Sequence, residues 1–193
     1  MREEQTEIGP RIRSDDEPNE PMIAFWLVPR FEEKELFGAL IKNLAARFEA
    51  PVFEPHVTLF GDRIEKDGAL QTLQGIAEDT APLQLKVERI GVAGVYTKTL
   101  FVQFRPSVEA GALAARIRAA LHGESSYRFD PHLSLLYKDM PLPAKAQLAS
   151  EIEIPLPRVT FDLLKVIRCP AQIHQREDVE AWQTIGERPL AGR

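Results

Sequence analysis

The sequence contains one seven-residue block twice. Residues Phe53–Leu59 read FEPHVTL and residues Phe129–Leu135 read FDPHLSL, so a shift of 76 residues superposes them. Four of the seven positions are identical, and the other three keep their charge, shape or hydroxyl group. A chain that repeats a block over this distance is expected to fold as two related units. This repeat limits the possible folds more than any other feature of the sequence.

The same shift aligns two further segments. Phe25–Val28 falls on Phe101–Phe104, and both are short apolar runs typical of buried strands. An apolar helical stripe also aligns, with Phe37, Ile41 and Ala45 falling on Leu113, Ile117 and Leu121. We therefore expect a strand-helix-strand unit that is used twice, as two lobes related by a pseudo-two-fold axis. A 76-residue unit is longer than the repeats of solenoid proteins.

Hydrophobic periodicity supplies the remaining elements. Strands are predicted at Ile23–Val28, His56–Phe60, Leu83–Ile90, Thr99–Arg105, His132–Tyr137, Val159–Arg168 and Ala181–Ile185. Helices are predicted at Glu32–Ala50, Asp67–Asp79, Ser107–His122 and Ala144–Ser150. Ser107 suits the N-cap of its helix, and Pro143 suits the first turn of the last one. The predicted fold class is α+β, with two pseudo-symmetric antiparallel sheets, helices outside and a central groove.

Composition narrows the domain organisation and the partners. Met1–Pro21 carries seven acidic and three basic residues, so we predict a disordered acidic tail at 1–21 and a folded domain at 22–193. The tail accounts for most of the net charge of -5, which argues only against binding to long polyanions. No apolar run is long enough for a membrane span, and no export signal is visible, so a cytoplasmic protein is expected. The single cysteine, Cys169, cannot form an internal disulfide.

The repeated block predicts a phosphodiester site. Alternate side chains of a strand share a face, so His56 lies beside Thr58, and His132 lies beside Ser134. If the axis brings the two strands together, two imidazoles and two hydroxyls meet in one cavity. A neutral histidine could then remove a proton from the attacking oxygen, while a protonated one donates to the leaving oxygen. The hydroxyls would donate to phosphate oxygens, with no metal and no cofactor required. The sequence does not distinguish the base from the acid.

These residues resemble a known family. His56-Val57-Thr58-Leu59 and His132-Leu133-Ser134-Leu135 are similar to the paired motifs of the 2H phosphoesterases, whose fold is LigT-like. The flanking residues are closest to the cyclic phosphodiesterase-like branch. The resemblance implies hydrolysis of 2′,3′-cyclic nucleotides or of ADP-ribose 1″,2″-cyclic phosphate. The product would be the 2′-phosphate of the nucleotide or the 1″-phosphate of ADP-ribose. It also implies that Trp26 and Tyr137 contact substrate, although strict strand alternation turns Tyr137 away from His132.

Alternatives remain open at this stage. The chain could act on RNA ends as a 2′-5′ phosphodiesterase or ligase, or it could bind nucleotides or RNA without turnover. A monomer is expected.

Glu54 and Asp130 could orient the histidines that follow them, and His122 and His174 are predicted at the surface. Four basic residues could add positive potential to the pocket, although each could equally lie on a solvated face: Lys98, Arg105, Lys165 and Arg168.

Overall fold

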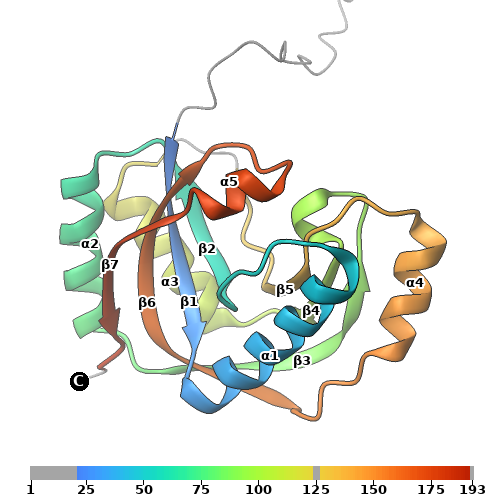
Figure 1. The fold of residues 1–193 in the computed structure, drawn as a ribbon. Helices are drawn as coiled ribbons and strands as arrows, with labels where there is room; N and C mark the ends of the chain where they lie inside the picture. Colours follow the sequence, from blue (N-terminus) through green and yellow to red (C-terminus); the bar gives the residue numbers. More distant parts are fainter. Residues whose placement is uncertain (1–20, 124–126, 192–193) are drawn as a thin grey trace, which may run out of the picture.

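The structure, a computed structural model, describes residues 21–123 and 127–191 (Figure 1). The predicted acidic tail lies outside the described residues except for Pro21, where the first strand begins. The strands are β1 (Pro21–Pro29), β2 (Val57–Asp62), β3 (Leu83–Val92), β4 (Leu100–Phe104), β5 (His132–Leu136), β6 (Arg158–Pro170) and β7 (Gln183–Pro189). The helices are α1 (Phe31–Phe48), α2 (Lys66–Glu78), the short 3-10 helix η1 (Tyr96–Lys98), α3 (Val108–Ala120), α4 (Leu142–Glu151) and α5 (Arg176–Glu180).

Each predicted helix and strand is present, with ends that shift by a few residues. The Ser107 hydroxyl accepts a hydrogen bond from the backbone N–H of Ala110 and so caps α3, as predicted. The sequence reading missed α5. The sequence feature that indicates this helix is an acid three residues after its N-cap, Gln175. The Asp178 carboxylate accepts a hydrogen bond from the backbone N–H of Gln175 at 3.2 Å. Since Ala181 ends this helix, β7 starts later than predicted.

The strands form one antiparallel sheet in the order β1-β2-β5-β4-β3-β6-β7, so the two predicted sheets are joined into one. The first part of β6 pairs with β3, and its longer second part pairs with β1 and β7. Six strands therefore form a closed circuit of pairings, and β7 extends it at one side. The two halves meet at a single β2–β5 pair, Val57 with Leu133. Because these residues are equivalent in the repeat, the pseudo-two-fold axis passes through this pair.

The helices tie the two halves together. α1 lies between β1 and β2 in the chain but packs on β5 of the second half, whereas α3, between β4 and β5, packs on β2 of the first half. α2 covers β6 and β7, and α4 covers β3 (Figure 1). The repeated units are therefore interlocked, and each buries its apolar helix stripe against the other. Within the described residues, no helix has the length and apolarity to cross a membrane.

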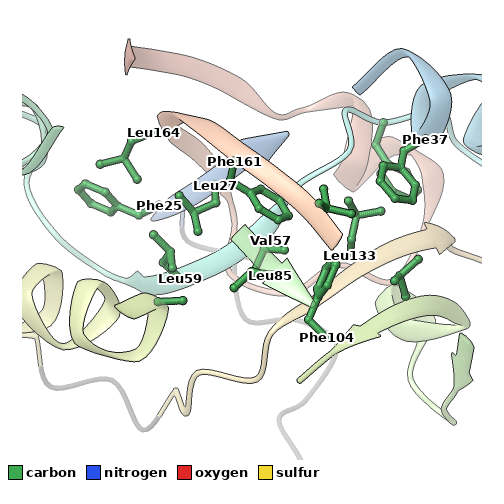
Figure 2. Close-up of a cluster of buried hydrophobic side chains, with 14 of the residues drawn as sticks. Phe25, Leu27, Phe37, Val57, Leu59, Leu85, Phe104, Leu133, Phe161 and Leu164 are labelled. Atoms are coloured by element: carbon green, nitrogen blue, oxygen red, sulfur yellow. The ribbon is translucent and has the colours of Figure 1, made fainter. Parts of the chain in front are cut away.

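The main core runs through both halves (Figure 2). Phe25 and Leu27 of β1, Val57 and Leu59 of β2, and Leu133 of β5 all point into it. The residues that alternate with them in the strands, among which are His132 and Ser134, face the opposite side of the sheet. One face of β2 and β5 thus provides the packing, and the other is available for chemistry.

The strand register corrects one detail of the repeat. The gap-free shift aligns Phe101 with Phe25, but β1 pairs Trp26 with Thr58, and β4 pairs Phe101 with Ser134. Because Thr58 and Ser134 are equivalent, Phe101 is the structural counterpart of Trp26. The second half therefore has one more residue between its two strands than the first half. A bulge precedes both Trp26 and Phe101, so the irregularity itself is repeated.

Candidate active site

The Val57–Leu133 pair brings the two motifs together. In an antiparallel ladder centred on this pair, His56 lies opposite Ser134, and Thr58 lies opposite His132. Val57 and Leu133 point into the core, so their four neighbours lie on the other face of the sheet. Opposed side chains in such a ladder have Cβ atoms about 4.5–5.5 Å apart. Two imidazoles and two hydroxyls therefore converge about one point, arranged diagonally.

Both histidine rings are oriented by the backbone. His56 Nδ1 lies 2.7 Å from the carbonyl oxygen of Glu54, and His132 Nδ1 lies 2.8 Å from that of Asp130. A carbonyl oxygen only accepts, so each Nδ1 carries the hydrogen and donates it. In the neutral ring the lone pair is then on Nε2. The predicted orienting role of the two acids is thus carried out by their main chain, and any residue with the same backbone conformation could supply it.

His56 is enclosed by aromatic rings and is only 6% exposed. Its ring stacks on Trp26, with centroids 3.6 Å apart and planes 10° apart. Trp182 and Phe53 meet it edge-on, at 5.7 Å and 6.4 Å. Burial removes water from the charged form and lowers the pKa of His56 to about 4, against the opposing effect of its hydrogen bond to Glu54. His56 is therefore neutral at pH 7, with Nε2 unprotonated.

His132 has a more polar setting, and its side chain is 22% exposed. Phe101 meets its ring edge-on at 5.5 Å, and an Asp130 carboxylate oxygen lies 3.8 Å from Nδ1. Burial lowers the pKa of His132, the backbone hydrogen bond to Asp130 raises it, and the nearby Lys98 lowers it. The two histidines are thus equivalent in the repeat but differ in how readily each binds a proton.

The carboxylates of Glu54 and Asp130 are both held by lysines. Lys165 donates to Glu54 at 2.8 and 3.0 Å, and Lys34 adds a second ion pair at 2.6 Å. Burial raises the pKa of Glu54, but hydrogen bonds from these lysines outweigh it and the net shift is downward. On the other side, Asp130 binds Lys98 and also accepts from Gln103 at 2.9 Å. These contacts likewise hold the pKa of Asp130 below its usual range despite partial burial.

The structure shows which groups Lys98 and Lys165 contact. Lys98 and Lys165 were predicted as possible sources of positive potential in the pocket. Both form ion pairs with the acids that precede the histidines. Each lysine comes from outside the motif it supports, Lys165 from β6 and Lys98 from η1. They therefore fix the position of the Glu54 and Asp130 backbone, and through it the two imidazoles. Nothing in the sequence pattern of the motifs indicates these partners.

The two hydroxyls differ in their partners. Ser134 donates to the backbone carbonyl of Thr97 at 2.8 Å, so its hydrogen is already engaged. Thr58 has no hydrogen-bond partner for its side chain among the described residues, although its carbonyl accepts from the Tyr127 hydroxyl at 2.9 Å. The Thr58 hydroxyl can thus donate to a bound anion directly, whereas that of Ser134 must first turn from Thr97.

The predicted aromatic residues take up different positions. Trp26 lies on the face that carries the histidines and stacks on one of them. Tyr137 follows the end of β5, is 4% exposed, and stacks on Phe53 with centroids 4.1 Å apart. Burial raises the pKa of Tyr137, partly opposed by a hydrogen bond with Ser134. Its ring supports the site side chains, and direct contact with substrate stays a prediction for both residues.

Phe53, Phe101 and Trp182 complete the aromatic surroundings, although the sequence reading gave them no role in the site. Phe53 belongs to the repeated block, but its partner Trp182 comes from the far end of the chain. The indole Nε1–H of Trp182 is buried without an acceptor in the described part of the chain. Trp182 also meets Trp26 edge-on at 5.0 Å, so two tryptophans from opposite ends of the sequence adjoin His56.

The remaining candidates lie elsewhere. His122 and His174 are exposed, as predicted. Arg105 and Arg168 are also exposed, and no contact with the motif residues is found for them in the described residues. Across 21–123 and 127–191, no three His, Cys, Asp or Glu side chains are placed to hold a metal ion. Cys169 is a free buried thiol, and burial raises its pKa to about 11.

Comparison with known proteins identifies the fold. Residues 27–168 match the 2′-5′ RNA ligase superfamily. TT0787 of Thermus thermophilus is similar, with a TM-score of 0.59, 16% identity and coverage of 89% of this chain and 98% of that one. E. coli LigT complexed with 3′-AMP has a TM-score of 0.53 and 18% identity, with coverage of 89% of this chain and 99% of that one. Its complex with ATP has a TM-score of 0.51 and 19% identity, with coverage of 89% and 98% of the same two chains. At these identities the structures support the fold alone. No curated protein sequence matches the chain.

Proposed function

Since the chain belongs to the 2′-5′ RNA ligase superfamily, the 2H phosphoesterases, we propose that it hydrolyses cyclic phosphodiesters by a two-histidine mechanism. The substrate class is a 2′,3′-cyclic nucleotide or ADP-ribose 1″,2″-cyclic phosphate. The observation that carries the proposal is the diagonal arrangement of His56, Thr58, His132 and Ser134 about the Val57–Leu133 pair. LigT has been crystallised with 3′-AMP and with ATP, which is consistent with a nucleotide as the ligand.

His56 is the general base in this proposal. Its Nδ1–H is held by the Glu54 carbonyl, and its aromatic enclosure keeps the ring neutral at pH 7. An Nε2 lone pair on that face can accept a proton from water as the water attacks phosphorus. A neutral base must be available before the reaction starts, and a pKa of about 4 ensures that the ring is unprotonated at neutral pH.

His132 is the general acid. To donate from Nε2 while Nδ1–H binds the Asp130 carbonyl, the ring must be an imidazolium. The Asp130 carboxylate at 3.8 Å and the greater exposure of His132 favour that form relative to His56. Burial holds the pKa of His132 below its usual value in the free protein, and a bound phosphate anion would raise that pKa. The proton then goes to the ring oxygen that leaves phosphorus.

The hydroxyls bind the non-bridging oxygens. Thr58 donates directly, and Ser134 joins after turning from the Thr97 carbonyl, so that both stabilise the charge that builds up in the transition state. In-line attack by water breaks the bond opposite the entering oxygen. The proposed product keeps its phosphate on the 2′ oxygen, so the 3′ bond is the one that breaks.

The test is turnover of 2′,3′-cyclic AMP by wild type, His56→Gln and His132→Gln, with EDTA present. Each variant is expected to lose at least about 10²-fold in kcat, because each loses one acid-base step. The control is His174→Gln, an exposed histidine outside the site, which should keep the wild-type rate. Activity that vanishes with EDTA and returns with a divalent metal would refute the metal-independent scheme. A near wild-type rate in either site variant would remove that histidine from the mechanism.

The same assay separates the other candidate functions. Faster cleavage of a 2′-5′-linked oligonucleotide than of any cyclic phosphate would favour the reaction on RNA ends. Tight binding of nucleotides without turnover by the wild type would favour a binding module.

A further inference from the structure

A groove of about 500 Å³ adjoins the His132 side of the site. Its walls come from β3, β4 and the segment that leads into β5, and Phe101, Gln103 and Asp130 line it. We call it the β3–β4 groove. Phe101 contacts the His132 ring edge-on, and Asp130 lies against His132 Nδ1, so the groove begins where the candidate site ends. Its volume falls in the range of small-molecule sites, about 300–1,000 Å³.

The sheet register places a cation at the far side of this groove. Gln103 pairs with His132 on one side and with Arg89 on the other, so these three residues form a row across β5, β4 and β3. Two strand spacings, about 10 Å, separate the backbones of Arg89 and His132. Arg89 lines the groove, and no ion pair holds it in the described part of the chain. A free guanidinium at this distance is suited to an anion other than the phosphate between the histidines.

Gly91 leaves space for this guanidinium. A Cβ on Gly91 would lie 3.0 Å from Arg89 Nη1 and 2.5 Å from the Phe101 ring, so both side chains occupy the space above Gly91. The absence of a side chain on Gly91 thus leaves room for both groups, on the face of the sheet that carries His132. Lys98, 4.5 Å from the centroid of the same ring, is already paired with Asp130. Among the described residues that line the groove, Arg89 is therefore the cation without an ion pair.

At the equivalent positions of the other half, the described residues provide no unpaired cation. By the strand register, the counterparts of Gln103, Arg89 and Gly91 are Val28, Leu163 and Lys165. Two of these are apolar, and the third is a lysine bound to Glu54 and Glu187. The pseudo-two-fold relation thus holds for the histidines and hydroxyls but not for the surface beyond them. A substrate that extends past the reacting phosphate would therefore meet a groove cation on the His132 side.

We propose that the β3–β4 groove binds a second phosphate of the substrate, with Arg89 as its ligand. The inference rests on the proposed hydrolysis of a cyclic phosphate and narrows its substrate class. The preferred substrate carries another phosphate besides the one that is opened, as a cyclic-phosphate RNA end and ADP-ribose cyclic phosphate both do. A 2′,3′-cyclic mononucleoside without a 5′ phosphate is the poorer substrate. The rim residue Glu88 opposes this binding and limits its strength.

The kinetic test compares 2′,3′-cyclic AMP with its 5′-phosphorylated form, which differs by one phosphate. In the wild type kcat/KM is expected to be about tenfold or more higher for the phosphorylated substrate, the effect of one charge-assisted contact. Arg89→Gln should lose this preference and keep the wild-type rate on 2′,3′-cyclic AMP, and Glu88→Gln should increase the preference. The matched control is Arg188→Gln, which removes the same charge from an exposed position on β7 and should change neither rate.

Equal kcat/KM for the two substrates in the wild type would overturn the inference, as would an equal loss on both in Arg89→Gln. A second experiment measures binding without turnover. Calorimetry compares the affinities for 2′-AMP and adenosine 2′,5′-bisphosphate, which differ by the second phosphate. The wild type should bind the bisphosphate at least about tenfold more tightly, and Arg89→Gln should not. A failure of turnover with this binding difference intact would count against the hydrolysis alone. Comparing a dinucleotide that ends in a cyclic phosphate with ADP-ribose 1″,2″-cyclic phosphate then identifies the source of the second phosphate.

Discussion

The burial of His56 makes a measurable contribution to how stability depends on pH. Its pKa is about 4 in the folded chain and 6.5 in the unfolded chain. Between these values the unfolded chain binds a proton that the folded chain does not, so stability rises with pH across this window and falls as the solution is acidified. The perturbation that isolates the effect is His56→Gln, which removes the titrating group and keeps a side chain that can donate to the Glu54 carbonyl.

The magnitude follows from the two pKa values. At pH 7.5 both states leave the ring neutral, and the contribution to the pH dependence is close to zero. At pH 5 the unfolded chain is mostly protonated and the folded chain is not, which costs the wild type about 2 kcal/mol through this one group. Other groups that titrate over the same range act on wild type and variant alike and cancel in the difference.

The assay is urea denaturation of both proteins at pH 7.5 and pH 5. The free energy of unfolding of the wild type should fall between these pH values by about 2 kcal/mol more than that of His56→Gln. A difference below about 0.5 kcal/mol would refute the argument, because the aromatic enclosure would then not hold the ring neutral. If the variant does not fold, the Cε1–H resonance of His56 in the wild type provides the same information. It should titrate near pH 4, and a midpoint at 6 or above would contradict the structure.

Three further predictions follow from individual contacts. On a nitrophenyl phosphodiester, whose leaving group needs no proton, His132→Gln should lose less activity than His56→Gln, and equal losses would contradict the assignment of acid and base. Lys165→Met should destabilise the fold by about 2 kcal/mol in urea denaturation because it leaves the partly buried Glu54 with Lys34 alone, and adding Glu54→Gln should recover part of the loss. Ser107→Ala removes the N-cap of α3 and should cost about 1 kcal/mol, whereas no change in the urea midpoint would show that the cap contributes nothing.

The repeat and the periodicity of apolar residues were enough to predict the strands, the four longer helices and the residues that meet at the centre. This was possible because each of these is a local pattern, and because a duplicated unit carries its side chains to equivalent positions. α5 was not predicted, because it is only five residues long and has one buried residue and no apolar stripe. The one-residue change in register was not predicted, because it lies between the first strand of each half and the helix stripe, where the sequence match does not extend.

The sequence by itself determined that His56 and His132 occupy equivalent positions, each two residues before a hydroxyl. Only the tertiary structure decided how they differ, because the surroundings of each ring come from distant segments. Trp182 joins Trp26 around His56, whereas Lys98 and Arg89 lie on the His132 side. The proton affinity of a ring depends on its burial and on the charges near it, and neither is encoded in a motif of four residues. Duplication therefore specified a symmetric pair, and packing made it an unequal one.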